Sequence, residues 1–305
     1  PEPWWTPNVG AHLDPAELKP ENCQHPVEFL ENVLVSYFDG HDLSMPLLNN
    51  VAEQILPKLR RANCDLKAVG REIAGDQVLS GAVLRTVNSP MYRGVEHIST
   101  VSAAVVRIGV KALRTILLHQ SVRSAIFAKH SLTKHFANVL WRRSLGDACI
   151  MRGLAGLMRT DQDDSHLIGL MHDIGSVLVL RIINDQIKTG YTPVDLNSFE
   201  YLRQQTHQEF GELIAKAWQL PPELTDLITN HHRYPAPDDP LATHRWMLVL
   251  TDMIGGMLYS EEPENYDLIH CRPAVELDLS DRPEYHTWLS QLPAEIEQTL
   301  QDSEA

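Results

Sequence analysis

The sequence lacks any uncharged apolar run long enough to cross a bilayer, and its first residues contain neither the basic nor the apolar region of a secretory signal. Cysteine is also scarce, because only four occur among 305 residues and no two of them form a C-x-x-C pair. Such spacing is typical of reduced, packed thiols and argues against a disulfide framework or a zinc knuckle. We therefore expect a cytoplasmic protein that does not enter a membrane.

Positive charge is low overall, since the chain carries a formal net charge of -14 at pH 7. This balance excludes a general attraction to nucleic acid or anionic lipid, which need a cationic surface. Residues 97–146 are the exception, because they contain eight Lys or Arg residues and no Asp or Glu. The stretch is either a surface for a signalling protein or small anionic ligand, or a solvated helix surface balanced by acidic neighbours. If it binds a partner, the favoured contact residues share one helical face: Arg107, Lys111 and Arg114.

Convincing strand patterns are absent, and apolar residues recur instead at helical spacing from Pro26 onward. The pattern predicts an all-helical fold with an extended, proline-rich arm at 1–24, lobes at 25–133 and 134–262, and an extension at 263–305 with a terminal helix. Beyond a first helix that Gly40 can close, the expected helices cover residues 46–61, 65–74, 76–88, 99–107, 110–129, 135–158, 165–184, 198–205, 206–219, 222–232, 241–260 and 283–301.

Two helix starts are predicted from side-chain chemistry as well as from periodicity. Asp65 precedes the apolar residues of helix 65–74 and can accept hydrogen bonds from the first free N–H groups. Thr206 and Glu209 have the spacing of a capping box. A helix boundary is therefore expected at 206.

The expected helix 165–184 is apolar on nearly every side and should be buried. His172 and Asp173 nevertheless stand in its middle. A buried carboxylate that has no cation or hydrogen-bond donors destabilises the fold by several kcal/mol. The chain is therefore expected to supply a partner for Asp173.

Other predicted helices also place imidazole and carboxylate groups on their apolar stripes. Nitrogen and carboxylate donors that converge from separate helices suit zinc, iron, manganese or nickel. The predicted metal ligands are His172, Asp173, His207, His231, His232 and Asp252.

Each of these residues alone has a simpler explanation. A single histidine on an apolar face is usually a satisfied core residue, and His231 and His232 can simply end a helix favourably. Taken together, four inward histidines and two buried carboxylates would otherwise need separate hydrogen-bond partners. The joint pattern therefore favours a divalent metal centre.

The segment 171–175 (MHDIG) resembles the HDIG signature of the HD phosphohydrolase superfamily, and the later candidate ligands follow in the order of its HD-GYP branch. The upstream half is similar, more narrowly, to the HDOD (HD-related output domain) family of bacterial signalling modules. The segments that carry this similarity are 43–46 (LSMP), 75–76 (GD), 84–89 (LRTVNS), 108–109 (IG) and 140–144 (LWRRS). The resemblance implies an all-helical fold in which an N-terminal helical lobe packs on a C-terminal HD-like lobe.

The sequence departs from the catalytic pattern of this superfamily. Arg143 stands where a histidine normally ligates the metal, and the earlier acidic ligand of the binuclear branch falls near Val139. A guanidinium cannot be a ligand, because it stays protonated and has no free lone pair. Ser176 replaces the lysine that follows HDIG in the HD-GYP branch, and the residues after His232 lack that branch's glutamate and GYP motif.

Arg143 has two alternative roles. It can point inward and neutralise Asp173 or Asp252 in place of a lost metal. It can equally form an ordinary ion pair with Asp147, four residues later on the same helix.

Two functions follow from the resemblance. The first is a non-catalytic or degenerate signalling module that binds a protein or a small anionic ligand, with or without a retained divalent ion. The second is a metal-dependent phosphohydrolase for phosphomonoesters or phosphodiesters, in which an ion activates water, His172 and Asp173 are catalytic, and Arg143 grips a phosphate oxygen. The missing ligands favour the first function.

Overall fold

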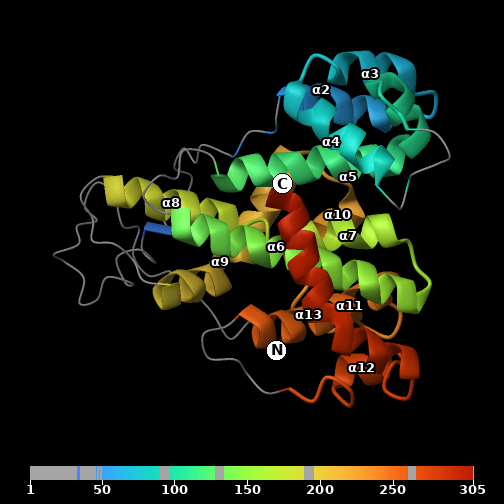
Figure 1. The fold of residues 1–305 in the computed structure, drawn as a ribbon. Coiled ribbons are helices and arrows are strands. Elements are labelled where there is room, and N and C mark those ends of the chain that lie inside the picture. The colour runs from blue at the N-terminus through green and yellow to red at the C-terminus, as the bar shows by residue number, and fades with distance from the viewer. Residues whose placement is uncertain are drawn as a thin grey trace. The chain divides into compact units, whose positions relative to one another are not determined.

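This computed structural model describes residues 33–34, 46, 48, 50–89, 92, 97–127, 134–188, 196–259 and 266–304. All regular structure in these ranges is helical (Figure 1), so the predicted fold class is confirmed. The predicted arm at 1–24 and most of the first expected helix lie outside the described residues. The helices are α2 (Asn50–Leu59), α3 (Leu66–Ile73), α4 (Gln77–Asn88), α5 (Val101–Phe127), α6 (Lys134–Met158), α7 (Gln162–Met171), α8 (Ser176–Lys188), α9 (Leu196–Ala217), α10 (Pro222–Asn230), α11 (Ala242–Tyr259), α12 (Arg272–Glu276) and α13 (Pro283–Glu304).

The chain forms two compact units. The first combines Ile126–Arg142 and His172–His231 with the described residues up to Pro46. In this unit α9 packs against both α8 and α10. The Trp218 indole N–H donates to the Pro46 carbonyl at 2.8 Å, which ties Pro46 to the residue that follows α9.

The second unit combines Leu47–Ala125, Arg143–Met171 and His232–Ala305. Its α11 packs against α7 and α12. Helix α13 lies close to α6 at Gly153, where a Cβ would come within 2.4 Å of the Trp288 indole nitrogen. The predicted terminal helix therefore exists and packs on this unit.

Helix α5 contains the break that the sequence predicts. Gly109 has φ 78° and ψ -177°, a backbone conformation that residues with a Cβ rarely adopt. The break separates the segments expected as helices 99–107 and 110–129.

One predicted helix start is confirmed and the other is wrong. Asp65 caps α3 by accepting hydrogen bonds from the N–H groups of Lys67 and Ala68. Thr206, by contrast, lies inside the continuous helix α9, where its hydroxyl donates to the Leu202 carbonyl at 2.9 Å. A threonine hydroxyl can be satisfied inside a helix in this way, so the capping-box spacing does not mark an end.

The single helix predicted at 165–184 is also wrong, because α7 ends at Met171 and α8 begins at Ser176. The intervening residues form a turn in which the N–H of Ser176 bonds to the Asp173 carbonyl three residues earlier. The burial predicted for this segment holds. One described segment, Gln162–Ile187, is long and apolar enough to cross a membrane, but 89% of its most apolar window is buried inside the protein.

Asn88 closes the loop that follows α4. Its side-chain amide donates to the carbonyls of Leu84 and Ile98 at 2.9 Å each, and its side-chain oxygen accepts from the Ile98 N–H at 3.0 Å. Asn88 thus holds the two ends of the segment together through backbone groups that would otherwise lack these partners.

We predict that Asn88→Ala lowers the free energy of unfolding by about 1–3 kcal/mol, because three hydrogen bonds are lost and partly buried backbone groups remain. Urea denaturation followed by circular dichroism measures this loss. Ser89→Ala, which removes one hydroxyl bond to the Thr86 carbonyl, is the control and should cost less. An equal loss in the two variants would contradict the bridging role of Asn88.

Candidate metal centre

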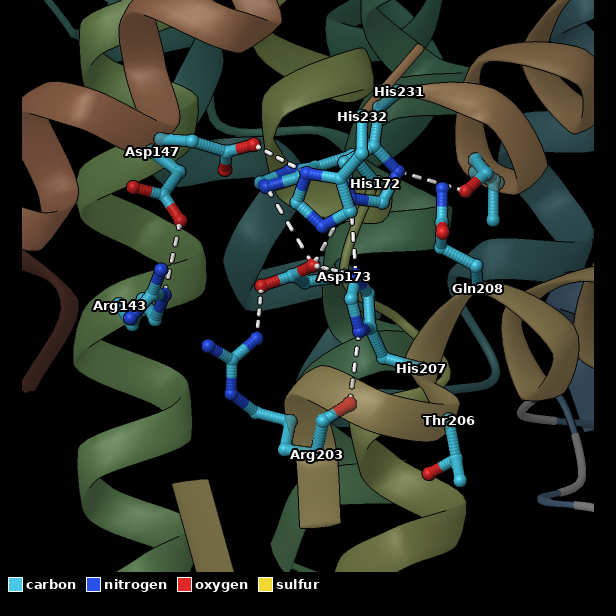
Figure 2. A network of polar contacts seen from close by, with 12 residues as sticks. Arg143, Asp147, His172, Asp173, Arg203, Thr206, His207, Gln208, His231 and His232 are labelled. Atoms are coloured by element: carbon cyan, nitrogen blue, oxygen red, sulfur yellow. Dashed lines mark hydrogen bonds and ion pairs between the residues drawn. The ribbon is translucent and has the colours of Figure 1, made fainter. Parts of the chain in front are cut away.

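Four buried polar side chains converge in the first unit. His172 and Asp173 lie in the turn before α8, His207 lies on α9, and His231 caps the C-terminus of α10. Asp173 Oδ1 is 3.3 Å from His207 Nε2, 3.5 Å from His231 Nε2 and 3.8 Å from His172 Nε2 (Figure 2). These four predicted ligands are therefore brought together.

Backbone carbonyls fix the tautomers of two of the imidazoles. His207 Nδ1 lies 2.8 Å from the Arg203 carbonyl, and His231 Nδ1 lies 2.9 Å from the Ile228 carbonyl. A carbonyl oxygen can only accept, so each Nδ1 carries a hydrogen and each Nε2 directs a lone pair towards the centre. The two Nε2 atoms are 3.1 Å apart. Two lone pairs at this distance repel, so a proton or a metal ion must lie between the rings.

The donor set fits one divalent ion. The ligand atoms of His172, Asp173 and His231 all lie within 4.8 Å of one another, and His207 Nε2 adjoins two of them. Imidazole nitrogens with one carboxylate oxygen suit zinc, iron, manganese or nickel, and carbonyls on the far ring nitrogens are the usual outer contacts of metal-bound histidines. A bound ion would supply Lewis acidity and a more acidic water molecule.

The partner that the sequence requires for Asp173 is Arg203. Its Nη1 lies 2.6 Å from Asp173 Oδ2, and both side chains are buried. Burial alone would raise the pKa of Asp173, but the Arg203 guanidinium and the neighbouring imidazoles outweigh it and hold that pKa well below its usual value. Asp173 is therefore an ionised carboxylate.

Sequence analysis missed Arg203 because it placed a helix boundary at 206. In the continuous helix α9, Arg203 and His207 are four residues apart and share one face. That spacing was the available signal, and the capping-box pattern concealed it.

Arg143 belongs to the second unit and lies near Asp147. The distance between Arg143 Nε and Asp147 Oδ2 is 3.8 Å, and Asp147 is buried. This is the intrahelical ion pair that we considered as the alternative role. In the first of the two alternatives for Arg143, this residue neutralises Asp173. The structure places Arg203 in that position instead.

His232 and Asp252 pair with each other in the second unit, with 3.2 Å between His232 Nδ1 and Asp252 Oδ2. The His232 side chain is 48% exposed, so it is not buried as expected, and its role as a metal ligand stays a prediction. Its neighbour His231 is buried as expected. The two side chains differ because His231 caps the end of α10 and adjacent side chains there point in different directions.

The basic residues on α5 have acidic neighbours at the start of α7. Lys111 Nζ lies 2.7 Å from Asp161 and 3.2 Å from Asp164, and Arg114 also pairs with Asp164. Arg107 is exposed. The positive charge that these residues offer to a partner is therefore smaller than the sequence suggests. The ion pairs agree with the alternative interpretation, in which acidic neighbours balance the basic helix surface.

Gly175 allows the turn to approach α9 closely enough to form the centre. A Cβ at Gly175 would lie 1.9 Å from the His207 carbonyl oxygen and 2.4 Å from the Gly211 nitrogen. Backbone atoms cannot swing aside as a flexible side chain can. The glycine of the HDIG segment thus sets the distance between Asp173 and His207.

The model of the HDOD domain matches residues 45–234. This is more than half of the chain, so the protein belongs to the HDOD family.

Solved structures with the same fold include a candidate metal-dependent phosphohydrolase from Shewanella amazonensis SB2B and an HDOD domain protein with unknown function from Geobacter sulfurreducens. The first has a TM-score of 0.70 at 17% identity and covers 89% of this chain and 99% of its own. The second has a TM-score of 0.62 at 21% identity and covers 90% and 99%. At these identities the likeness shows the fold alone.

A relative of known sequence is an uncharacterized protein of Treponema pallidum (strain Nichols). It is 24% identical over 207 residues, which are 64% of this chain and 39% of that protein. The chain thus spans well under half the length of this relative.

We predict that Gly175→Ala lowers the free energy of unfolding by about 2–4 kcal/mol, because the added methyl group must push the turn away from α9. Gly81→Ala is the matched control, since its Cβ would meet only the Arg85 side chain at 3.5 Å. The control should be neutral or slightly stabilising, because alanine favours a helix. Thermal and urea melts measure both changes. A tolerated alanine at position 175 would refute the close approach.

Proposed function

We propose that this protein is a catalytically degenerate HDOD regulatory module of the cytoplasm, whose histidine–aspartate centre binds one divalent ion and does not turn over phosphate esters. The observation that carries the proposal is the charge partner of Asp173. Its second oxygen contacts a buried arginine, which occupies a direction that a second catalytic ion would need. The replacement of a superfamily ligand by Arg143, which lies near Asp147, supports the same conclusion.

The centre has residues for holding an ion but few for chemistry. His172, His207 and His231 supply nitrogen donors, Asp173 supplies one oxygen, and Arg203 neutralises the other oxygen. All five side chains are buried. An enclosed set of this kind suits a structural or sensory centre, because catalytic sites keep an open position for water or substrate.

We further propose that regulation acts through a partner protein or a small anionic ligand at Arg107, Lys111 and Arg114 of α5. Support for this surface is the local absence of acidic residues from 97 to 146. An anionic ligand there would compete with Asp161 and Asp164 for two of the three cations.

The second candidate function is a metal-dependent phosphohydrolase, and the four convergent donors favour it. When purified protein is supplied with manganese, iron or nickel and with p-nitrophenyl phosphate or bis-p-nitrophenyl phosphate, we expect no turnover above that of Asp173→Ala. The inactive variant corrects for contaminating phosphatases. Turnover that disappears in Asp173→Ala would make hydrolysis the function.

Metal content separates a one-ion centre from a two-ion centre. In protein purified without chelator, we expect one divalent ion per chain by elemental analysis, because four donors are enough to coordinate a single ion. His207→Ala should lose the ion, whereas His286→Ala, at an exposed histidine, should retain it. Two ions per chain, or none, would contradict the proposed centre.

A further inference from the structure

Arg203 contacts the centre in two ways (Figure 2). Its Nη1 donates to Asp173 Oδ2 at 2.6 Å, and its backbone carbonyl accepts from His207 Nδ1 at 2.8 Å. Glu200, three residues earlier on α9, accepts from Nε of the guanidinium at 3.0 Å and lies 3.0 Å from Nη2. The side chain is 3% exposed. Arg203 is thus held in one orientation, and it fixes both an aspartate and a histidine of the centre.

The two oxygens of Asp173 have different partners. Oδ1 faces the imidazole nitrogens, whereas Oδ2 faces the guanidinium. An aspartate that bridges two ions must offer one oxygen to each of them. The guanidinium stays protonated, so its charge repels a second cation beside Oδ2 and favours an ion at Oδ1. Asp173 is therefore available as a ligand through Oδ1.

The ion pair also supplies the charge that a metal would otherwise supply. A buried carboxylate that loses its only cation is strongly destabilising. In a centre that depended on metal for this compensation, removal of the ion would unfold the surrounding helices. Here the compensating charge is covalently part of α9 and stays in place whether or not an ion is bound.

We propose that Arg203 is a resident cation that positions Asp173 for a single ion and keeps the centre folded when no ion is bound. The single ion rests on the proposed function, whereas the folding role rests on the ion pair itself. Arg203 acts through Asp173 and His207 and is a positioning residue.

The chain offers a matched control for this role. Arg245 pairs with Asp239 at 2.6 Å and its side chain is 8% exposed, compared with 3% for Arg203. The two ion pairs have the same length, although the Asp239 side chain, at 14% exposed, is less buried than Asp173, at 5%. Asp239, unlike Asp173, does not belong to the candidate metal centre. Arg203→Met and Arg245→Met remove the same charge and leave side chains of similar size.

The test is the melting temperature of the wild type and both variants, measured in EDTA and again in excess Mn²⁺ or Zn²⁺. Wild-type protein should remain folded in EDTA, with its melting temperature lowered only by the lost binding free energy of the ion. Arg203→Met should melt roughly 5–10 °C lower than wild type in EDTA and should recover at least half of this loss with added metal. Arg245→Met should also melt lower, but added metal should not restore it.

Arg203→Lys provides a second measurement, because lysine keeps the charge but loses the forked geometry. Its melting temperature in EDTA should lie between those of the wild type and Arg203→Met. If Arg203→Met does not fold, the lysine variant decides the question. The proposal is supported if added metal raises the melting temperature of Arg203→Lys more than that of the wild type. An equal rise in the two proteins overturns it.

Two results overturn the role of Arg203: equal metal responses in Arg203→Met and Arg245→Met, or unfolding of the wild type by EDTA. The proposed function fails separately, through phosphate ester turnover or through the absence of an ion in the wild type. The two failures are therefore distinguishable, because one is measured by stability and the other by metal content and hydrolysis.

Discussion

A buried carboxylate needs a cation, and the arrangement of the first unit depends on how Asp173 meets that need. Arg203 reaches Asp173 from α9 and, through its own carbonyl, also orients His207 one turn later. Both contacts require α9 to be continuous through residue 206 and require the turn at Gly175 to approach its backbone closely. One ion pair thus couples the helix, the turn and the imidazoles, because none of them can shift without exposing a charge in an apolar interior.

This coupling is consistent with the proposed role of an HDOD module that binds an ion without catalysis. The histidines retain the outer hydrogen bonds that direct their Nε2 atoms inward, so the centre keeps the shape of an ion site. The charge balance, however, is met by the protein itself. A permanent cation beside the aspartate does not exchange with solvent as an ion does, and its charge disfavours a second cation beside Oδ2. The solved structures at 17–21% identity share the fold, and function is decided by the residues of the site.

The sequence predicted much of the fold, because helical periodicity and special backbone residues act locally. The cap at Asp65 follows from one residue and was confirmed, and the boundary expected between helices 99–107 and 110–129 lies at Gly109. The predictions at 165–184 and at 206 failed for opposite reasons. An apolar run concealed a turn at His172–Gly175, and a polar capping pattern lay inside a continuous helix. In both places packing of distant segments outweighed the local preference.

For the candidate site, the sequence by itself determined that His172, Asp173, His207 and His231 would be buried, because each lies on or beside an apolar stripe, and that Asp173 would need a cation. It could not determine which cation. Arg143 and Arg203 are both four residues from a polar partner on a helix, and only the packing of α9 against α8 decides that Arg203 meets the aspartate. The tertiary structure likewise separated His231 from His232, because adjacent residues at a helix end point in different directions.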